Sequence, residues 1–420
     1  MFLLATVLFI NYIDRGTVAT VAHSLQGDLK LDDAQMGKLF SAFFWVYAIV
    51  QIPVGWLAER YGAGRVLTIG LLIWATATIL AGFAHSFSML LGLRLMLGLG
   101  ESAGFPCVSK LLALAVPAKG LGTANGIVGF AYTFGPAVGL FVGGQIMIHF
   151  GWRAPFVVFG VLSLLWLIPW SRTKVPTEAT AVARAKEAEA GNLVPGAAEI
   201  PDDRWPTYWM IWKQRSLWGT GLGLFSSNYV FYFILNWMPE YLERVRGYSA
   251  DKMTTVGFWA FVTMALSALA AGWAIDRYVR RGGSANFGYK SVMAVAHVGA
   301  LICMLAMAAG SEMVSIVAMF VYQALCGASS PGVYAMSQIL AGPRASGRWV
   351  GIQNCVGNLS GSVAPWLTGV MIKETGHFTS AFVVAGMVSL LGLIGWLWMV
   401  PTLKELHWEQ PPGRALPEAA

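Results

Sequence analysis

The chain has 420 residues, of which 56% are hydrophobic and only 12% are charged, about half the charged share that is usual in soluble domains. A soluble core could not bury this much apolar surface, and one membrane span takes about 20 apolar residues, so the length allows roughly a dozen spans. The composition excludes a disordered chain, a disulfide scaffold, and nucleic-acid binding as the reason for the net charge of +7.

Apolar runs predict the membrane spans in chain order. The N-terminus is apolar from Met1 but lacks a basic segment and a small-residue cleavage site, so we expect a first span there and not a signal peptide. The first six runs lie near residues 1–22, 37–58, 66–84, 87–109, 122–146 and 154–171. Six more lie near residues 217–240, 253–275, 289–309, 313–335, 347–371 and 379–400.

Between these two sets of runs, the composition changes. Residues 172–215 are rich in charged side chains and contain Gly191, Pro195 and Pro201, which predicts a linker. Within it, the segment 179–190 is rich in Ala, Glu, Lys and Arg, which favours a short surface helix.

The basic residues predict the orientation in the membrane. With a cytoplasmic N-terminus, the inner loops and tails hold 19 of the 28 Lys and Arg residues and the outer loops hold 7. Because cytoplasmic loops carry an excess of Lys and Arg, we expect both termini in the cytoplasm and an even number of spans.

An internal repeat predicts the architecture. Residues 55–61 (GWLAERY) recur 217 residues later as residues 272–278 (GWAIDRY), and both copies follow the second span of their set. Two parallel six-span halves around a linker are the layout of many secondary transporters. We therefore expect an all-α membrane protein with twelve transmembrane helices in two pseudo-symmetric halves. Its predicted parts are an N-terminal half (1–171), a cytoplasmic linker (172–215), a C-terminal half (216–400) and a cytoplasmic tail (401–420).

Three motifs resemble those of the major facilitator superfamily. They are the loop segment 55–65 (GWLAERYGAGR), the fourth-span pattern Arg94-x-x-x-Gly98-x-Gly100, and Gly135-Pro136 with the glycines that follow it in the fifth span. Further segments resemble the anion:cation symporters of that superfamily, which include bacterial galactonate, glucarate, hexuronate, tartrate and phthalate carriers and animal sialin. These segments are 11–15 (NYIDR), 40–43 (FSAF), 51–53 (QIP), 100–106 (GESAGFP), 236–239 (NWMP) and 357–361 (GNLSG).

Four charged residues lie within the predicted spans, namely Asp14, Arg15, Arg94 and Glu101. An ionised group at mid-bilayer costs about 2.5–3.5 kcal/mol, so these groups face a wet cavity or each other. Two interpretations remain open: an ion-pair cluster that fixes helix packing, or a site for an anion and a proton. Arginine forms a two-pronged contact with a carboxylate, whereas a carboxylic acid in an apolar surround can hold a proton near neutral pH.

Helical spacing separates the roles of these groups. Arg94 and Glu101 are seven residues apart, so they lie on one face of the fourth span. Tyr12 precedes Arg15 by three residues and shares its face, whereas Asp14 points about 100° away. The arginines therefore suit an organic anion, and the two acids suit a proton.

The resemblance implies the same assignment. In the anion:cation symporters, the acids that match Asp14 and Glu101 are the proton-coupling pair. The arginine that matches Arg15 holds the substrate carboxylate, and the one that matches Arg94 links the proton and substrate sites. Residues that contact substrate are matched here by Tyr12, Tyr47 and Asn358.

Two positions depart from the pattern of the galactonate-type carriers. Tyr132, a further candidate for substrate contact, stands where those carriers have a polar amide, and the tenth span reads PGVYAMSQ over residues 331–338. These departures concern the identity of the acid that is bound. They do not change the expectation that the substrate carries a carboxylate. Weaker candidates for the cavity, with packing as the alternative role, are Asn228, Tyr229, Tyr232, Gln353 and Asn354.

Charged residues at the cytoplasmic span ends form a third group, namely Glu59, Arg60, Arg65, Asp276 and Arg277. We predict that they form an inter-helix charge network that holds an inner gate closed in one state. The alternative is that they only set the topology.

The sequence therefore predicts a proton-coupled symporter that imports a small organic anion by alternating access, with a slight preference for sugar acids. An exporter or exchanger of organic or aromatic carboxylates is the alternative within transport. A non-transporting receptor or enzyme is the alternative outside it, but the sequence offers no soluble catalytic domain and no nucleotide-binding loop. We expect a monomer in the bacterial inner membrane whose partners are the anion, protons and lipid. The four cysteines form no Cys-x-x-Cys pair, so we expect no metal and no cofactor beyond the coupling proton.

Overall fold

The computed structural model describes residues 1–31, 33–117, 120–173, 175 and 206–408, and within them every regular element is a helix. The N-terminal helices are α1 (Phe2–Leu29), α2 (Asp33–Tyr61), α3 (Ala63–Ala81), α4 (Phe87–Glu101), α5 (Gly104–Ala115), α6 (Leu121–Phe150), α7 (Ala154–Leu165) and α8 (Leu167–Ser171). The C-terminal helices are α10 (Tyr208–Trp212), α11 (Arg215–Arg244), α12 (Ala250–Arg280), α13 (Ala285–Ala309), α14 (Glu312–Thr375), α15 (Thr379–Leu393) and the π-helical segment η2 (Ile394–Met399).

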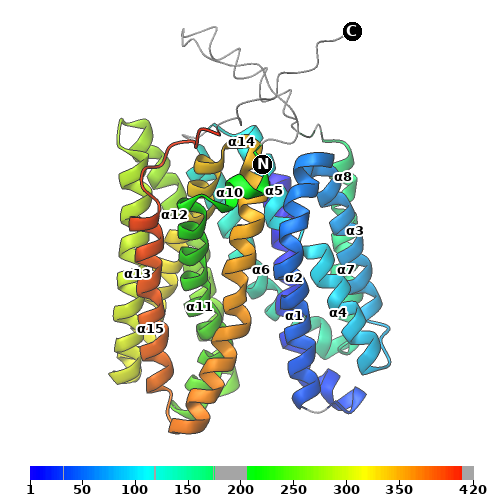
Figure 1. Cartoon of the computed structure of the whole chain (residues 1–420). Helices are drawn as coiled ribbons and strands as arrows, with labels where there is room; N and C mark the ends of the chain where they lie inside the picture. Colours follow the sequence, from blue (N-terminus) through cyan, green and yellow to red (C-terminus); the bar gives the residue numbers. More distant parts are fainter. Residues whose placement is uncertain (32, 118–119, 174, 176–205, 409–420) are drawn as a thin grey trace.

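The N-terminal and C-terminal helices form two groups that lie side by side. In Figure 1, α1–α8 occupy the right-hand side and α10–α15 the left-hand side, and the chain begins at the upper end of the bundle. Most of the predicted linker, including the expected helix over 179–190, lies outside the described residues, but α10 belongs to the linker's last part. The hydroxyl of Tyr208 on α10 donates a hydrogen bond to the carbonyl oxygen of Ile52, so this segment is attached to α2 at the upper end.

Each predicted apolar run falls on one helix or on two consecutive helices. Eight helices in the described part of the chain are long and apolar enough to cross a membrane. The runs at 1–22, 87–109 and 217–240 are helical but are not among these eight, and α4 has only 15 residues. The two runs at 313–335 and 347–371 form one helix, α14, whose backbone breaks at Gly342 with a φ of 66°.

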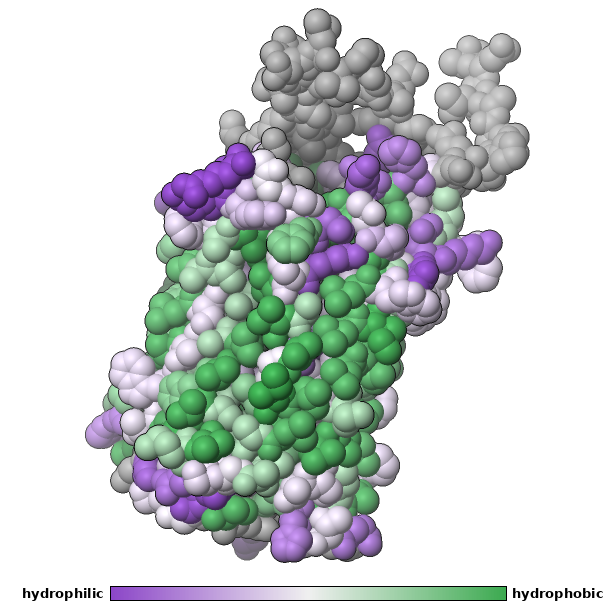
Figure 2. All heavy atoms as spheres, turned by 90° about the vertical axis from the view of Figure 1, so that its left-hand side faces the viewer, coloured by the Kyte–Doolittle hydropathy of each residue, from purple (hydrophilic) through white to green (hydrophobic). Residues whose placement is uncertain are grey.

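An apolar belt surrounds the middle of the bundle. Figure 2 shows it on the face formed by the C-terminal helices, with hydrophilic residues gathered towards both ends. Leu266 on α12 and Val295 and Ile302 on α13 are among the exposed apolar side chains. An apolar surface of this extent is stable only against lipid, so the chain is an integral, multi-pass membrane protein.

Glycines let the helices that carry the intramembrane charges pack closely. A Cβ atom at Gly139 of α6 would lie 2.5 Å from the carbonyl oxygen of Ile13 on α1. A Cβ atom at Gly98 of α4 would lie 2.7 Å from the carbonyl oxygen of Phe43 on α2. Small residues allow backbones to approach in this way, so the glycine motifs of the fourth and fifth spans fix the positions of α1 and α4.

Candidate functional site

An ion pair between α1 and α4 lies at the centre of the N-terminal helices. The Nε atom of Arg15 donates a hydrogen bond to Oε2 of Glu101 at 3.0 Å. The Glu101 side chain is fully buried, whereas 15% of the Arg15 side chain is exposed. The Arg15 Nη2 atom also lies 3.5 Å from Oδ1 of Asn11. Glu101 therefore pairs with an arginine of another helix, although Arg94 shares its own helix face.

Three aromatic rings surround the Arg15 guanidinium. Its central carbon lies 4.3 Å from the ring centre of Tyr12, 4.4 Å from that of Tyr47 and 5.0 Å from that of Phe43. Cation–π attraction of this kind holds the planar guanidinium in place. Tyr12 and Tyr47 also line a cavity, so Arg15 lies directly behind its wall.

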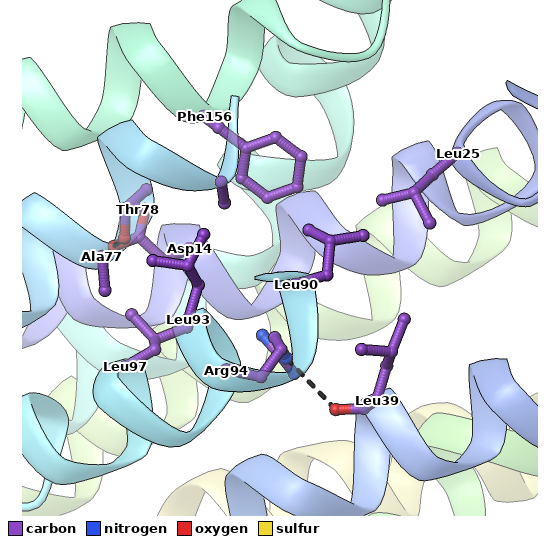
Figure 3. A pocket seen from close by; sticks show the side chains of 11 residues that line it. Asp14, Leu25, Leu39, Ala77, Thr78, Leu90, Leu93, Arg94, Leu97 and Phe156 are labelled. Atoms are coloured by element: carbon purple, nitrogen blue, oxygen red, sulfur yellow. Dashed lines mark hydrogen bonds between the residues drawn. The ribbon is translucent and has the colours of Figure 1, made fainter. Parts of the chain in front are cut away.

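Asp14 lines a different cavity (Figure 3). Its Oδ2 atom accepts a hydrogen bond of 3.4 Å from the hydroxyl of Thr78 on α3. Arg94 reaches the same cavity, and its Nε atom donates to the carbonyl oxygen of Leu39 at 3.3 Å. We call this the side cavity; it is lined by Asp14, Leu25, Leu39, Ala77, Thr78, Ala81, Leu90, Leu93, Arg94, Leu97 and Phe156.

The two charged side chains that line the side cavity, Asp14 and Arg94, each have one buried atom that is not hydrogen-bonded to a described residue. Among the described residues, neither Oδ1 of Asp14 nor Nη1 of Arg94 has a hydrogen-bond partner. The ring of Phe43 lies between the two arginines, 5.1 Å from Arg94 and 5.0 Å from Arg15. The four intramembrane charges are thus divided between two surroundings, with the Arg15–Glu101 pair behind the wall of one cavity and Asp14 and Arg94 lining the other.

The other cavity lies between the N-terminal and C-terminal helices, and we call it the central cavity. It is lined by Tyr12, Tyr47, Phe105, Tyr132, Leu224, Ser227, Asn228, Phe231, Tyr232, Met264, Cys326, Ser329, Ser330, Val333, Tyr334 and Asn358. Of the residues predicted to bind substrate, Tyr12, Tyr47, Tyr132 and Asn358 line it, while Arg15 and Arg94 do not. None of the lining residues is charged, and Arg15 is the charged group placed behind its wall.

Polar contacts order the side of the central cavity formed by α11 and α14. The Tyr232 hydroxyl donates to Oδ1 of Asn358 at 2.9 Å, and Nδ2 of Asn358 donates to the carbonyl oxygen of Asn354 at 2.9 Å. Among the weaker candidates, Asn228 and Tyr232 line the cavity, whereas Tyr229, Gln353 and Asn354 are buried outside its lining.

Sequence reasoning missed several lining residues, chiefly Phe105, Phe231, Ser329 and Ser330. Phe105 follows the interruption between α4 and α5, so its direction depends on a bend that helical spacing does not report. Its place within the GESAGFP segment was the one available signal.

Two acids join the N-terminal and C-terminal helices at the upper end. Asp276 of α12 accepts hydrogen bonds from the backbone N–H groups of Gly122 (3.0 Å) and Thr123 (2.6 Å) at the start of α6. Glu59 of α2 accepts one from the backbone N–H of Gly347 on α14 at 3.0 Å and pairs with the buried Lys110. The carboxylate of Asp276 is favourable at the start of α6, because the first N–H groups of a helix have no partner within it and the positive end of the helix dipole lies there.

Two of the predicted arginines, Arg60 and Arg277, directly follow the two acids in the sequence. Arg65 and Arg277 are exposed, and Arg277 stacks on Trp273 of its own helix at 5.3 Å. Arg60 lies 5.8 Å from the ring of the neighbouring Tyr61. Backbone N–H groups bind both acids, and Lys110 also binds Glu59. A further contact at this end joins Asn125 of α6 to Gln338 of α14 at 2.7 Å.

Solved structures share this fold. A proton:xylose symporter, XylE bound to 6-bromo-6-deoxy-D-glucose, superimposes with a TM-score of 0.78 and 16% identity over 96% of each chain. The human organic anion transporter MFSD10 (TETRAN) gives a TM-score of 0.71 at 16% identity and covers 94% of this chain and 98% of its own.

Sequence relatives are more informative about the family. The D-galactonate transporter of Escherichia coli is 31% identical over 415 residues, which cover 94% of each protein. A probable galactarate/D-glucarate transporter of Bacillus subtilis, GudP, is 27% identical over 437 residues, covering 99% of this chain and 95% of that protein. The sequence model of the Major Facilitator Superfamily matches residues 4–283 and 283–419. The chain therefore belongs to the Major Facilitator Superfamily, is a transporter and not an enzyme, and is of the anion:cation symporter type.

Proposed function

We propose that this protein is a proton-coupled symporter that imports a small organic anion. In this mechanism the carboxylate of the substrate replaces the carboxylate of Glu101 at Arg15. The observation that carries the proposal is the buried Arg15–Glu101 pair directly behind the wall of the central cavity. Removing one member of a buried ion pair costs about 3–5 kcal/mol, since the other charge stays uncompensated. Protonation of Glu101 therefore leaves the buried charge of Arg15 uncompensated, and a substrate carboxylate that binds there compensates it.

This exchange makes the binding of proton and anion cooperative. The anion binds best when Glu101 is neutral, so by linkage the proton binds best when the anion is present. Asp14 is the second proton site of the proposal, and Arg94 connects it to the region around Glu101 through Phe43. The loaded protein then has fewer uncompensated charges than a singly loaded one, which favours the conformational switch only when both ligands are bound.

The proposed architecture is two six-span halves that rock about the central cavity. In it α4 with α5, α7 with α8, and α15 with η2 each make one span, while α14 makes two on either side of Gly342. We place both termini in the cytoplasm of a bacterial inner membrane, and we expect a monomer. The contacts of Glu59 and Asp276 then close the cytoplasmic end, and their release opens it.

The substrate is proposed to be a carboxylate. The names of the relatives, which include transporters of galactonate, galactarate and D-glucarate, support sugar acids. The alternative direction, export or exchange of organic or aromatic carboxylates, uses the same charges.

The test is uptake of labelled carboxylates by purified protein in proteoliposomes, with an imposed pH gradient, an imposed sodium gradient or neither. We expect accumulation of a carboxylate only with the pH gradient, accompanied by alkalinisation outside. Uptake that follows the sodium gradient alone, or an anion flux without proton movement, would contradict the proposal.

A further inference from the structure

We infer that the central cavity selects a carboxylate with a flat aromatic body over one with a hydroxylated chain. This inference rests on the proposed function, since it assumes that the carboxylate binds at Arg15. It names a substrate class for that same site other than the sugar acids that the names of the relatives support.

Aromatic rings dominate the wall around the position that such a body would occupy. Seven lining residues are aromatic, namely Tyr12, Tyr47, Phe105, Tyr132, Phe231, Tyr232 and Tyr334. Phe105 and Tyr334 stack with ring centres 4.8 Å apart and an angle of 15° between the planes. Tyr132 lies 5.5 Å from Phe105 and 5.2 Å from Tyr12. The rings therefore form a continuous group contributed by α1, α5, α6 and α14.

This group begins at the arginine. Tyr12 contacts the Arg15 guanidinium on one side and Tyr132 on the other. A carboxylate bound at Arg15 consequently directs the rest of its molecule towards Tyr132 and Phe105. Aromatic pairs gain stabilisation from offset or edge-to-face contacts beyond the burial of their area, so a planar ring is favoured at this position.

Five polar side chains of the wall already donate hydrogen bonds within the protein. The hydroxyls of Ser227, Ser329 and Ser330 donate to carbonyl oxygens of their own helices at 3.0, 2.9 and 2.9 Å. The Tyr334 hydroxyl donates to Oδ1 of Asn354 at 3.2 Å, and the Tyr232 hydroxyl donates to Asn358. These five donors are thus used before any ligand arrives.

A hydroxylated chain is at a disadvantage in such a cavity. Each of its hydroxyls loses water on entering and needs a new partner, and an unpaired hydroxyl in an apolar surround is costly. An aromatic ring carries no such groups and needs none. The same carboxylate on the two kinds of body should therefore bind with different affinities.

The test compares benzoate, cyclohexanecarboxylate and D-galactonate as ligands of the purified full-length protein, by calorimetry and by thermal shift. We expect benzoate to bind at least tenfold more tightly than D-galactonate, with cyclohexanecarboxylate between them because it is apolar but not flat. Tyr132→Asn should weaken benzoate binding roughly tenfold and leave or improve D-galactonate binding. Tyr132→Phe keeps the ring and should bind benzoate like the unmodified protein.

The outcomes separate the two proposals. Tighter binding of D-galactonate than of benzoate overturns the aromatic inference and leaves the proposed function in place. If none of the three carboxylates binds, although a cooperative unfolding transition shows that the protein is folded, both proposals are overturned. Equal benzoate affinity in Tyr132→Asn and Tyr132→Phe shows that the rings do not select the body, and it also overturns the inference.

Discussion

The N-terminal and C-terminal helices contact each other in matching ways at the upper end but differ where they face the central cavity. At the upper end, the acid of each GW-x-x-acid-RY copy, Glu59 or Asp276, accepts hydrogen bonds from backbone N–H groups of the opposite group of helices. At mid-depth, the pair Arg15–Glu101 belongs to α1 and α4, whereas α11 and α14 contribute neutral groups such as Tyr232 and Asn358.

In the proposed mechanism, the contacts at the upper end serve the conformational change, and the buried charges of the N-terminal helices serve coupling. In the proposed rocking mechanism the helices part and meet again at the upper end, and there both copies of the repeat make matching contacts. Coupling requires a proton carrier and an anion site close together, and one group of helices is enough to hold both. We therefore expect changes among the N-terminal charges to abolish coupling, and changes on the C-terminal side of the cavity to alter affinity alone.

The largest expected effect follows from Glu101→Gln, which keeps the shape of the protonated side chain but cannot release a proton. Uptake driven by a pH gradient should vanish. Binding of the anion, and exchange of internal for external anion, should survive because neither needs a net proton cycle. All three are measured on one purified preparation in proteoliposomes.

The competing interpretation of this variant is purely structural. If the pair with Arg15 only holds α1 against α4, Glu101→Gln should lower the unfolding temperature and reduce binding, exchange and driven uptake together. Persistent driven uptake would instead show that the proton does not pass through Glu101.

The next largest effect is expected for Arg15→Lys. An ammonium group keeps the charge but loses the planar two-pronged contact and much of the stacking on Tyr12 and Tyr47. Carboxylate affinity should fall about 10- to 100-fold, as for the loss of a charge-assisted hydrogen bond. Calorimetric titration measures it, with the exposed Arg65→Lys as the matched control. Near-normal affinity would remove Arg15 from the anion site.

An intermediate effect is expected at the upper end, from Asp276→Asn. The neutral amide weakens the contact with the start of α6, which is worth about 1–2 kcal/mol, so the population with the upper end open should rise roughly tenfold. Substrate binding should persist, since Asp276 lies outside the central cavity.

Cysteine labelling at both ends of the bundle reports this shift. Glu59→Gln should act in the same direction, because Glu59 makes the equivalent contact with Gly347. Labelling that is unchanged in both variants would return the two acids to a role in topology only.

The sequence predicts the helices well because apolar runs and glycine motifs are local signals. It also brings Tyr12, Tyr47 and Asn358 to the cavity wall, since matched motifs fix their faces. It does not predict that Glu101 pairs with Arg15 rather than with Arg94, since that choice depends on where α1 is placed by its contact with α6 at Gly139 and where α4 is placed by its contact with α2 at Gly98.

The stacking of Phe105 on Tyr334 is equally hidden from the sequence. Phe105 follows the interruption between α4 and α5, so its direction does not follow from the helical period of the residues before it. Helical spacing predicts which residues share a face only as long as the helix continues.

The smallest effect is expected for Tyr232→Phe, and it tests the C-terminal side of the comparison. The change removes the hydroxyl that donates to Oδ1 of Asn358 and keeps the ring that packs on Phe44 at 5.4 Å. One neutral hydrogen bond is worth about 0.5–1.5 kcal/mol, so the KM for the anion should change about 2- to 10-fold. The number of protons moved per anion should not change, because Asp14 and Glu101 are untouched. Parallel recordings of anion uptake and external pH give both quantities, and Phe44→Leu controls for packing around the ring. A changed proton-to-anion ratio in Tyr232→Phe would mean that the C-terminal helices share in coupling, and the division between the two sides of the cavity would then fail.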